Sequence, residues 1–284
     1  MELSQLVNFH SNKCRLERII DNKKNIIPFV GAGISKGCGL YLWEELLDLL
    51  AVEYLTPGQI KALKAANNVF KYVDKIVAAA GNVEMVMKRI GEIFQETEVI
   101  HTDIPKLLVS AFAPMVITTN YDTLLEEASA CSPLGRIKAL LPSHAGQMNE
   151  AIMLNARRLI KLHGSVEEIS SMILTSKQYK FYYGKKAKRT SATLPVYLKK
   201  IFEGKKVLFV GCSLDKDYTL DILGDCVKRN HNISHFAILP CFANQYRQIE
   251  RQKMLTKLGI EPIYYPEGDF EAVGQLLRYI ASVC

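Results

Sequence analysis

The sequence lacks the cysteine patterns that build a metal site or a disulfide framework. Its seven cysteines are an odd number, and no two of them form a CxxC pair. Structural zinc sites and disulfide-stapled domains need such spacings. We therefore expect free thiols in a reducing compartment, no zinc module and no bound metal.

Long apolar stretches are also missing. No run of hydrophobic residues approaches the ~20 needed to cross a bilayer. The segment from Met1 to Ile20 is mixed and charged, without the apolar centre of a signal peptide. These absences predict a cytoplasmic protein with no membrane partner. Internal repeats and low-complexity linkers are absent too, so the 284 residues suit one large α/β domain.

The positive charge of the chain is concentrated in one segment. The net charge is +7, and Lys177–Lys206 holds ten basic residues against a single acid. This basic segment could meet a phosphate-bearing ligand, a nucleic acid or an acidic protein surface, or it could be a solvated loop. Beyond a tyrosine-rich stretch at 179–183 it lacks the interleaved aromatic residues of single-strand binders. Direct nucleic-acid binding stays an open alternative.

Short apolar runs recur along the chain. Because they are continuously apolar rather than alternating, we expect each to be a strand covered by helices on both faces, as in a parallel sheet. The predicted strands are 25–30, 115–119, 158–162, 206–210, 235–239 and 260–265.

Helical patterns alternate with these strands. Thr56 can cap a helix that has Pro57 at its first position. Further helical signals occur at 83–94 and 244–258. Alternation of strands and helices predicts an α/β fold, a Rossmann-like doubly wound parallel sheet with a helical insertion and no zinc module. We expect one domain over 1–284, divided into an N-terminal helical segment (1–24), the core (25–55 and 106–284) and the insertion (56–105), with an irregular section near 165–200.

The first predicted strand ends in Gly-Ala-Gly-Ile-Ser at 31–35 and leads into a helix. Glycines there allow the backbone to approach a diphosphate, and a helix N-terminus supplies amide donors. A tight turn without a ligand is the alternative. The dinucleotide fingerprint is incomplete, because Lys36 occupies the position of its third glycine.

Three further strand ends carry polar residues or glycine. They are Thr-Thr-Asn-Tyr-Asp at 118–122, Lys-Leu-His-Gly at 161–164 and Gly-Cys-Ser-Leu at 211–214. Ligands of open parallel sheets bind at the carboxyl edge of the strands, so these ends could share one crevice. Taken singly, Asn120 and Asp122 could instead cap the next helix, and His163 could be a structural histidine.

Together, the four motifs resemble those of the sirtuins. GAGIS, TTNYD, KLHG and GCSL occur in the order and strand-end context of the sirtuin motifs GAG, TQNID, HG and GTSL. The resemblance covers the chain from about Asn25 to Leu214, and the last strands fit the same fold. It implies an NAD-binding domain.

Two departures narrow the implied function. Deacylating sirtuins carry paired CxxC motifs for zinc and a Pro-Asp-Phe-Arg segment, and this chain has neither. It looks more like the sirtuin-like domains of bacterial antiphage defence systems, which deplete NAD. The resemblance implies an NAD hydrolase that cleaves the nicotinamide–ribose bond to nicotinamide and ADP-ribose in abortive infection. An NAD-dependent protein deacylase and a non-catalytic NAD or ADP-ribose-binding regulatory subunit stay open as alternatives.

The same resemblance implies roles for individual residues. Asn120 would position a water and the ribose or carboxamide, and His163 would contact the ribose hydroxyls as a general base. Asp122 would anchor the carboxamide or orient its neighbours. NAD enters as the substrate, and no metal is expected. The residues assigned to NAD binding are Gly31, Ala32, Gly33, Ser35, Thr118, Asp122, Gly211 and Ser213.

Control by assembly is expected, because an unregulated NAD hydrolase would poison its own cell and the chain leaves no room for a sensor domain. In length the chain resembles a stand-alone sirtuin-like subunit that associates with a HerA-type hexameric ATPase. This analogy implies a homo-oligomer, and a HerA-type partner, with 1–24 and the helical insertion as contact surfaces.

Overall fold

A computed structural model of the chain describes residues 1–130, 132, 134–184, 194–214, 218–230 and 232–283. Part of the basic segment, residues 185–193, lies outside the described residues, as do Cys131 and Cys284.

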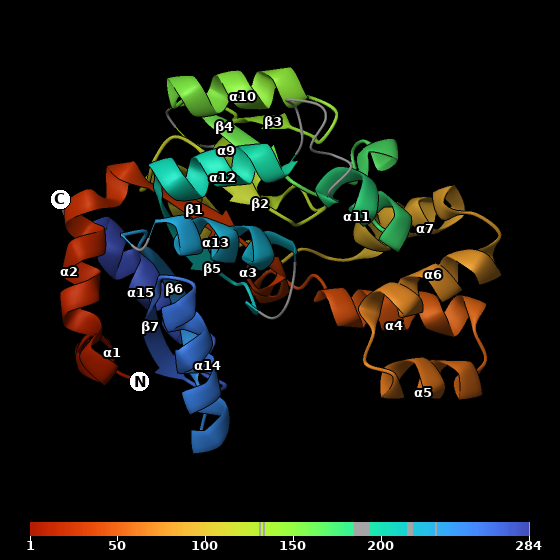
Figure 1. The fold of residues 1–284 in the computed structure, drawn as a ribbon, viewed down its shortest axis with the longest axis horizontal. Helices are drawn as coiled ribbons and strands as arrows, with labels where there is room; N and C mark the ends of the chain where they lie inside the picture. The colour runs from red at the N-terminus through yellow and green to blue at the C-terminus, as the bar shows by residue number, and fades with distance from the viewer. Residues whose placement is uncertain (131, 133, 185–193, 215–217, 231, 284) are drawn as a thin grey trace.

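Within these ranges, seven strands form one sheet in the order β3-β4-β2-β1-β5-β6-β7, with every neighbouring pair parallel (Figure 1). The strands are β1 (Ile26–Val30), β2 (Val116–Thr118), β3 (Lys138–Leu140), β4 (Arg158–Lys161), β5 (Lys206–Val210), β6 (His235–Cys241) and β7 (Ile260–Pro266). The predicted Rossmann-like α/β fold is confirmed.

Alternate residues of each inner strand enter two different cores. In β1, Ile27 and Phe29 belong to the core on one face, whereas Ile26 and Val30 belong to the core on the other. Each buried aliphatic or aromatic side chain contributes roughly 1.5–3 kcal/mol. Both faces of these strands are therefore buried against apolar side chains, which explains why the strands are apolar throughout rather than at every second residue.

Helices cover both faces of the sheet (Figure 1). Helices α10, α12, α13 and α14 contribute to one core, and α1, α2, α8, α9 and α15 contribute to the other. Their bounds are α1 (Leu3–Asn8), α2 (Asn12–Asn22), α8 (Ile104–Ser110), α9 (Leu124–Ala130), α10 (Ala145–Leu154), α12 (Leu194–Gly204), α13 (Tyr218–Arg229), α14 (Gln245–Lys257) and α15 (Glu271–Ser282). No helix in the described ranges is long and apolar enough to cross a membrane.

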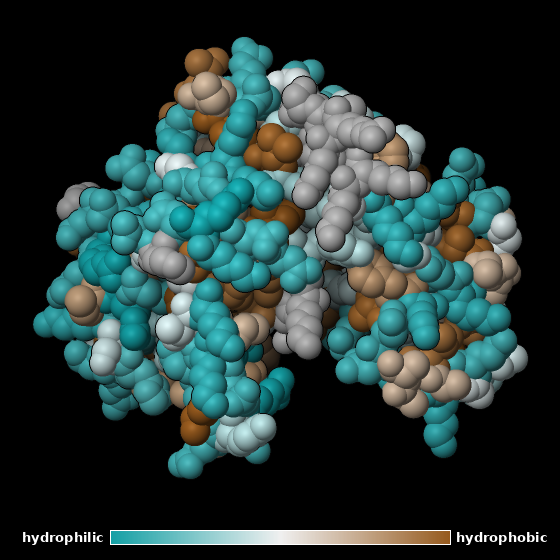
Figure 2. Space-filling view, in the orientation of Figure 1, coloured by the Kyte–Doolittle hydropathy of each residue, from teal (hydrophilic) through white to brown (hydrophobic). Residues whose placement is uncertain are grey.

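A separate helical lobe lies beside the sheet. It consists of α4 (Trp43–Tyr54), α5 (Pro57–Ala65), α6 (Val69–Ala80) and α7 (Val83–Glu96). The side chains of α4, α6 and α7 share a third core, which also takes in Tyr121 and Met172. Figure 2 shows a notch in the surface between this lobe and α14, on a face that is mostly hydrophilic.

The section near 165–200, expected to be irregular, is so only up to Thr175 and is helical in most of its remaining described residues. Its described part contains α11 (Ser176–Tyr183) and the start of α12. Thr175 begins α11 with a capping box, in which its hydroxyl accepts from the Gln178 amide and the Gln178 side chain accepts from the Thr175 amide. The spacing of Thr175 and Gln178 is a capping signal that the sequence already contains.

Candidate active site

The strand order places the topological switch point of the sheet at the carboxyl ends of the central strands. Strand β1 pairs with β2 on one side and with β5 on the other, and the chain reverses direction across the sheet at this point. Val30 is level with Thr118 and with Val210, so the segments that follow all three strands emerge side by side. This is the position at which open parallel sheets bind ligands.

The adjacent strands β2 and β4 carry Asn120 and His163 to the same edge. Thr118 is level with Lys161, and each of the two expected catalytic residues follows two positions later. The amide of Leu162 also donates to the carbonyl oxygen of Thr118 at 2.9 Å, which continues the pairing past the strands. The structure therefore brings the asparagine and histidine motifs together at neighbouring strand ends.

A hydrogen-bonded chain orients the carboxamide of Asn120. Its Nδ2 donates to Ser35 Oγ at 2.8 Å, and Ser35 Oγ donates to Asp122 Oδ2 at 2.6 Å. All three side chains are buried. Because Ser35 gives its single hydroxyl proton to Asp122, its oxygen accepts from Asn120, and the amide nitrogen of Asn120 therefore faces Ser35.

The other end of this carboxamide is open. Asn120 Oδ1 is buried, with the whole residue only 8% exposed, and no described residue donates a hydrogen bond to it. A buried acceptor without a donor is costly, and such groups in proteins often mark a ligand or water position. The carboxamide is thus held by the protein at its nitrogen, and its oxygen is an acceptor without a donor among the described residues.

Asp122 and Thr118 bond within the protein. Asp122 Oδ1 accepts from the Leu124 amide at 3.2 Å at the start of α9, so both carboxylate oxygens are engaged. Thr118 Oγ1 donates to Val30 O at 2.9 Å and accepts from the Asn120 amide at 3.0 Å. Of the two roles expected for Asp122, this geometry fits the orientation of its neighbours.

The glycines at the ends of β1 and β5 press against each other. The Gly31 and Gly33 amides donate to the carbonyl oxygens of Val210 and Gly211, both at 2.9 Å. A Cβ on Gly31 would lie 2.5 Å from Gly211 O, and Gly211 itself has a φ of +68°. Glycine is therefore needed here for the contact between the two loops. Ala32 is half-buried beside it at the start of α3 (Ala32–Gly37).

The exposed side of this contact continues to α14. Gly33 and Ser213 are exposed, and the Ser213 carbonyl oxygen accepts from Arg251 Nη2 at 2.6 Å. The guanidinium groups of Arg247 and Arg251 lie 3.9 and 4.8 Å from the centre of the Phe242 ring. The carboxyl edge of the sheet is thus positively charged beyond β5.

His163 is engaged at both ring nitrogens. Nε2 lies 2.9 Å from Tyr183 Oη, and Nδ1 lies 3.3 Å from Tyr179 Oη. One hydroxyl must donate and the other accept, because a neutral imidazole has one donor and one acceptor. Burial lowers the pKa of His163 from 6.5 to about 3, so the ring is neutral at physiological pH.

Aromatic rings from three parts of the chain cover this histidine. Tyr179 and Tyr183 stack with Tyr218 at centroid distances of 5.7 and 5.5 Å. Phe70, from α6 of the helical lobe, meets Tyr179 edge-on at 4.9 Å. The lobe, α11 and α13 therefore converge over His163.

A buried ion pair supports the same strand ends and was not expected from the sequence. Lys161 Nζ lies 2.9 Å from Glu126 Oε1, with neither side chain more than 3% exposed. Burial raises the pKa of Glu126, and Lys161 opposes that rise. The sequence signal for this ion pair was Lys161, a charged residue at the end of an otherwise apolar strand.

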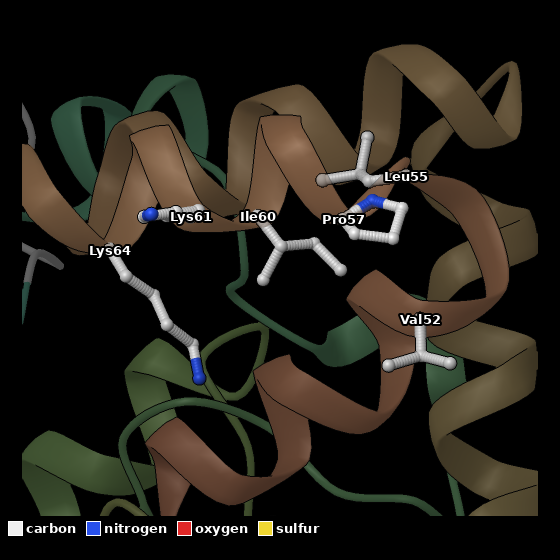
Figure 3. Close-up of a pocket in the computed structure, with 6 residues that line it drawn as sticks. All are labelled: Val52, Leu55, Pro57, Ile60, Lys61 and Lys64. Atoms are coloured by element: carbon white, nitrogen blue, oxygen red, sulfur yellow. The ribbon is translucent and has the colours of Figure 1, made fainter.

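Two surface grooves lie elsewhere. One, of about 490 Å³, is formed between α4 and α5 and is lined by Val52, Leu55, Pro57, Ile60, Lys61 and Lys64 (Figure 3). Another, of about 380 Å³, borders α7 near Arg89. None of the expected site residues lines either groove.

The described residues also contain no group of three or more His, Cys, Asp or Glu side chains that could hold a metal.

Comparison with known proteins places the chain in a family. A family model described as the SIR2-like domain matches residues 114–263, which include Asn120, His163 and Ser213. The chain is also 27% identical over 175 residues to the NAD(+) hydrolase ThsA of Acinetobacter baumannii (strain 532279). That alignment covers 61% of this chain and 34% of the relative, so the chain spans about a third of the relative's length. Since the family model matches more than half of the residues, the chain belongs to the SIR2-like domain family.

Proposed function

We propose that the chain is an NAD hydrolase that cleaves the nicotinamide–ribose bond and releases nicotinamide and ADP-ribose. The observation that carries this proposal is the buried, open acceptor Asn120 Oδ1, fixed through Ser35 and one strand away from the neutral His163. The activity in the name of the related ThsA protein supports the same substrate.

The chemistry suits these two groups. Nicotinamide leaves as a neutral molecule from a cationic ring, so its departure needs no proton donor. The barrier lies in positioning the ribose and in stabilising the positive charge that develops on it. Asn120 Oδ1 would accept from the attacking water or a ribose hydroxyl. As water adds to the ribose carbon and the bond to nicotinamide breaks, the neutral imidazole of His163 would accept the released proton.

The diphosphate would lie along the contact between the ends of β1 and β5. The amides of Gly31 and Gly33 already donate to the β5 backbone, so the glycines would shape the floor rather than bind phosphate directly. The exposed edge at Gly33 and Ser213, beside Arg251, is the side on which an anion would be favoured. Loss of cellular NAD through this reaction would serve antiviral defence by abortive infection.

The test is product analysis with purified protein. NAD is incubated over a series of protein concentrations, with and without an acetyl-lysine peptide, and the products are separated by chromatography. We expect nicotinamide and ADP-ribose in equal amounts without peptide. Turnover only with the peptide, with transfer of the acetyl group to ADP-ribose, would instead identify a deacylase. NAD binding without turnover at any concentration would identify a regulatory subunit.

A further inference from the structure

The buried ion pair between Lys161 and Glu126 is poorly explained by stability. Taking two charges out of water costs several kcal/mol per ion, and apolar residues of similar volume often give an equally stable or more stable protein. Glu126 Oε2 is also buried, and no donor within the described ranges reaches it. The pair therefore needs another reason to lie in this core.

Lys161 uses its remaining donors on the backbone beside Asn120. Its Nζ donates to the carbonyl oxygen of Tyr121 at 3.3 Å and, in a shorter bond, to that of Asp122. The Tyr121 oxygen accepts in addition from the Val166 amide at 3.0 Å. The ammonium thus joins the segment after β2 to the end of β4, two residues before His163.

We propose that Lys161 is a positioning residue for NAD cleavage, whose ammonium fixes the backbone at 121–122 and so holds Asn120 in register with His163. Glu126 accepts from the ammonium on its other side and offsets part of the free-energy cost of its burial. This inference rests on the proposed function. It predicts that the pair contributes to turnover through geometry, since a displacement of about 1 Å in a catalytic group can lower the rate about 100-fold.

The test separates stability from activity by removing both charges at once. In the Lys161→Met/Glu126→Leu variant, apolar side chains of similar size fill the site, so we expect a folded protein whose Tm falls only through the loss of the two hydrogen bonds to the Tyr121 and Asp122 carbonyl oxygens. We expect kcat for nicotinamide release to fall about 100-fold, with KM for NAD within about threefold. A folded double variant with wild-type kcat would overturn the proposal.

A control variant removes a partly exposed ion pair at the opposite edge of the sheet. Arg18 and Glu261 lie 2.5 Å apart between α2 and β7, away from the strand ends that carry the site. The Arg18→Met/Glu261→Leu variant should keep the wild-type kcat. An equal loss of kcat in both double variants would mean that any lost ion pair impairs turnover, which would also overturn the proposal.

Two further measurements keep the inference independent of folding and of the reaction itself. Glu126→Gln leaves Lys161 on the two carbonyl oxygens, so its kcat should stay within about threefold of wild type even if Tm falls. A 100-fold loss there would contradict the assignment. Hydrogen exchange of the Val166 amide, which shares the Tyr121 oxygen, should accelerate in the double variant whether or not the protein cleaves NAD. Unchanged exchange would refute the positioning role, whereas wild-type protein without nicotinamide release would refute only the proposed function.

Discussion

The two ends of the candidate site are built in opposite ways. At the end of β2, polar side chains bond to one another and leave the carboxamide oxygen of Asn120 open. At the end of β4, both nitrogens of His163 are bound by tyrosine hydroxyls beneath aromatic rings. The end of β2 therefore presents an acceptor without a partner, whereas the end of β4 presents a base whose nitrogens already have partners.

The difference has a simple structural origin. Asn120 is fixed by residues that follow two adjacent strands, whereas His163 is covered by a helix. Tyr179 and Tyr183 are four residues apart on α11, so both rings project from the same face toward the imidazole. A ligand would therefore meet the asparagine as the sheet presents it, but would have to displace hydroxyl groups to reach the histidine.

The largest expected effect is at the open end. Asn120→Ala removes the acceptor, and we expect nicotinamide release to fall roughly 1,000-fold, the upper range for one electrostatic contact in an active site. Circular dichroism should show an intact fold. Asn68→Ala, which removes an amide oxygen that caps α6, is the matched control and should leave the rate unchanged. Loss of less than tenfold in Asn120→Ala would show that the open acceptor is not part of the chemistry.

At the covered end, His163→Ala should lower the rate about 100-fold, as expected for loss of a general base. His144→Ala provides the comparison, because the His144 ring accepts from the Leu141 amide and takes no part in the crevice. If both histidine variants retain wild-type turnover, the imidazole at β4 is structural.

The tyrosine hydroxyls that cover His163 should affect substrate binding more than turnover. Tyr183→Phe removes one of the hydroxyl contacts that a ligand would have to replace, at about 1 kcal/mol for a neutral hydrogen bond. We therefore expect KM for NAD to fall about fivefold with little change in kcat. An increase in KM, or a large loss of kcat, would mean that Tyr183 orients the histidine for the reaction.

The smallest effect is expected from pH. Because the pKa of His163 is lowered to about 3 in the ligand-free protein, protonation of this ring should not reduce kcat/KM between pH 5 and 8. An acidic limb near pH 6.5 in the profile of kcat/KM would contradict a neutral His163 beneath the tyrosine hydroxyls before the substrate binds. Folding stability should behave differently. Below pH 6.5, His163 takes up a proton in the unfolded chain but stays neutral in the folded protein. The contribution of the neutral His163 to folding stability is therefore complete above pH 6.5 and is lost as pH falls toward 3.

Much of the fold followed from local sequence signals, because buried parallel strands are apolar on both faces. Six strands were predicted close to their observed bounds, and the helix predicted over 244–258 is α14. Strand β3 was missed. It has three residues at the sheet edge, and only Leu140 among them is buried, so it carries no apolar run.

The site was predictable only where its residues lie in short motifs. The sequence indicated Asn120 and His163, but it could not show that the tyrosines of α11 cover the imidazole or that Glu126 pairs with Lys161, 35 positions away. Contacts of this kind depend on how the chain folds back on itself. The two glycines of GAGIS were expected to let the backbone approach a diphosphate, and the sequence could not show that a Cβ on Gly31 or Gly33 would meet the backbone of Gly211.

The most direct test of the central claim is a crystal structure of the His163→Ala variant with NAD, in which slow turnover would preserve the substrate. The account predicts that the nicotinamide ribose lies within hydrogen-bonding distance of Asn120 Oδ1, with the diphosphate beside Gly33 and Ser213. NAD bound with its nicotinamide ribose away from Asn120, or outside the carboxyl edge of β1, β2 and β4, would contradict it.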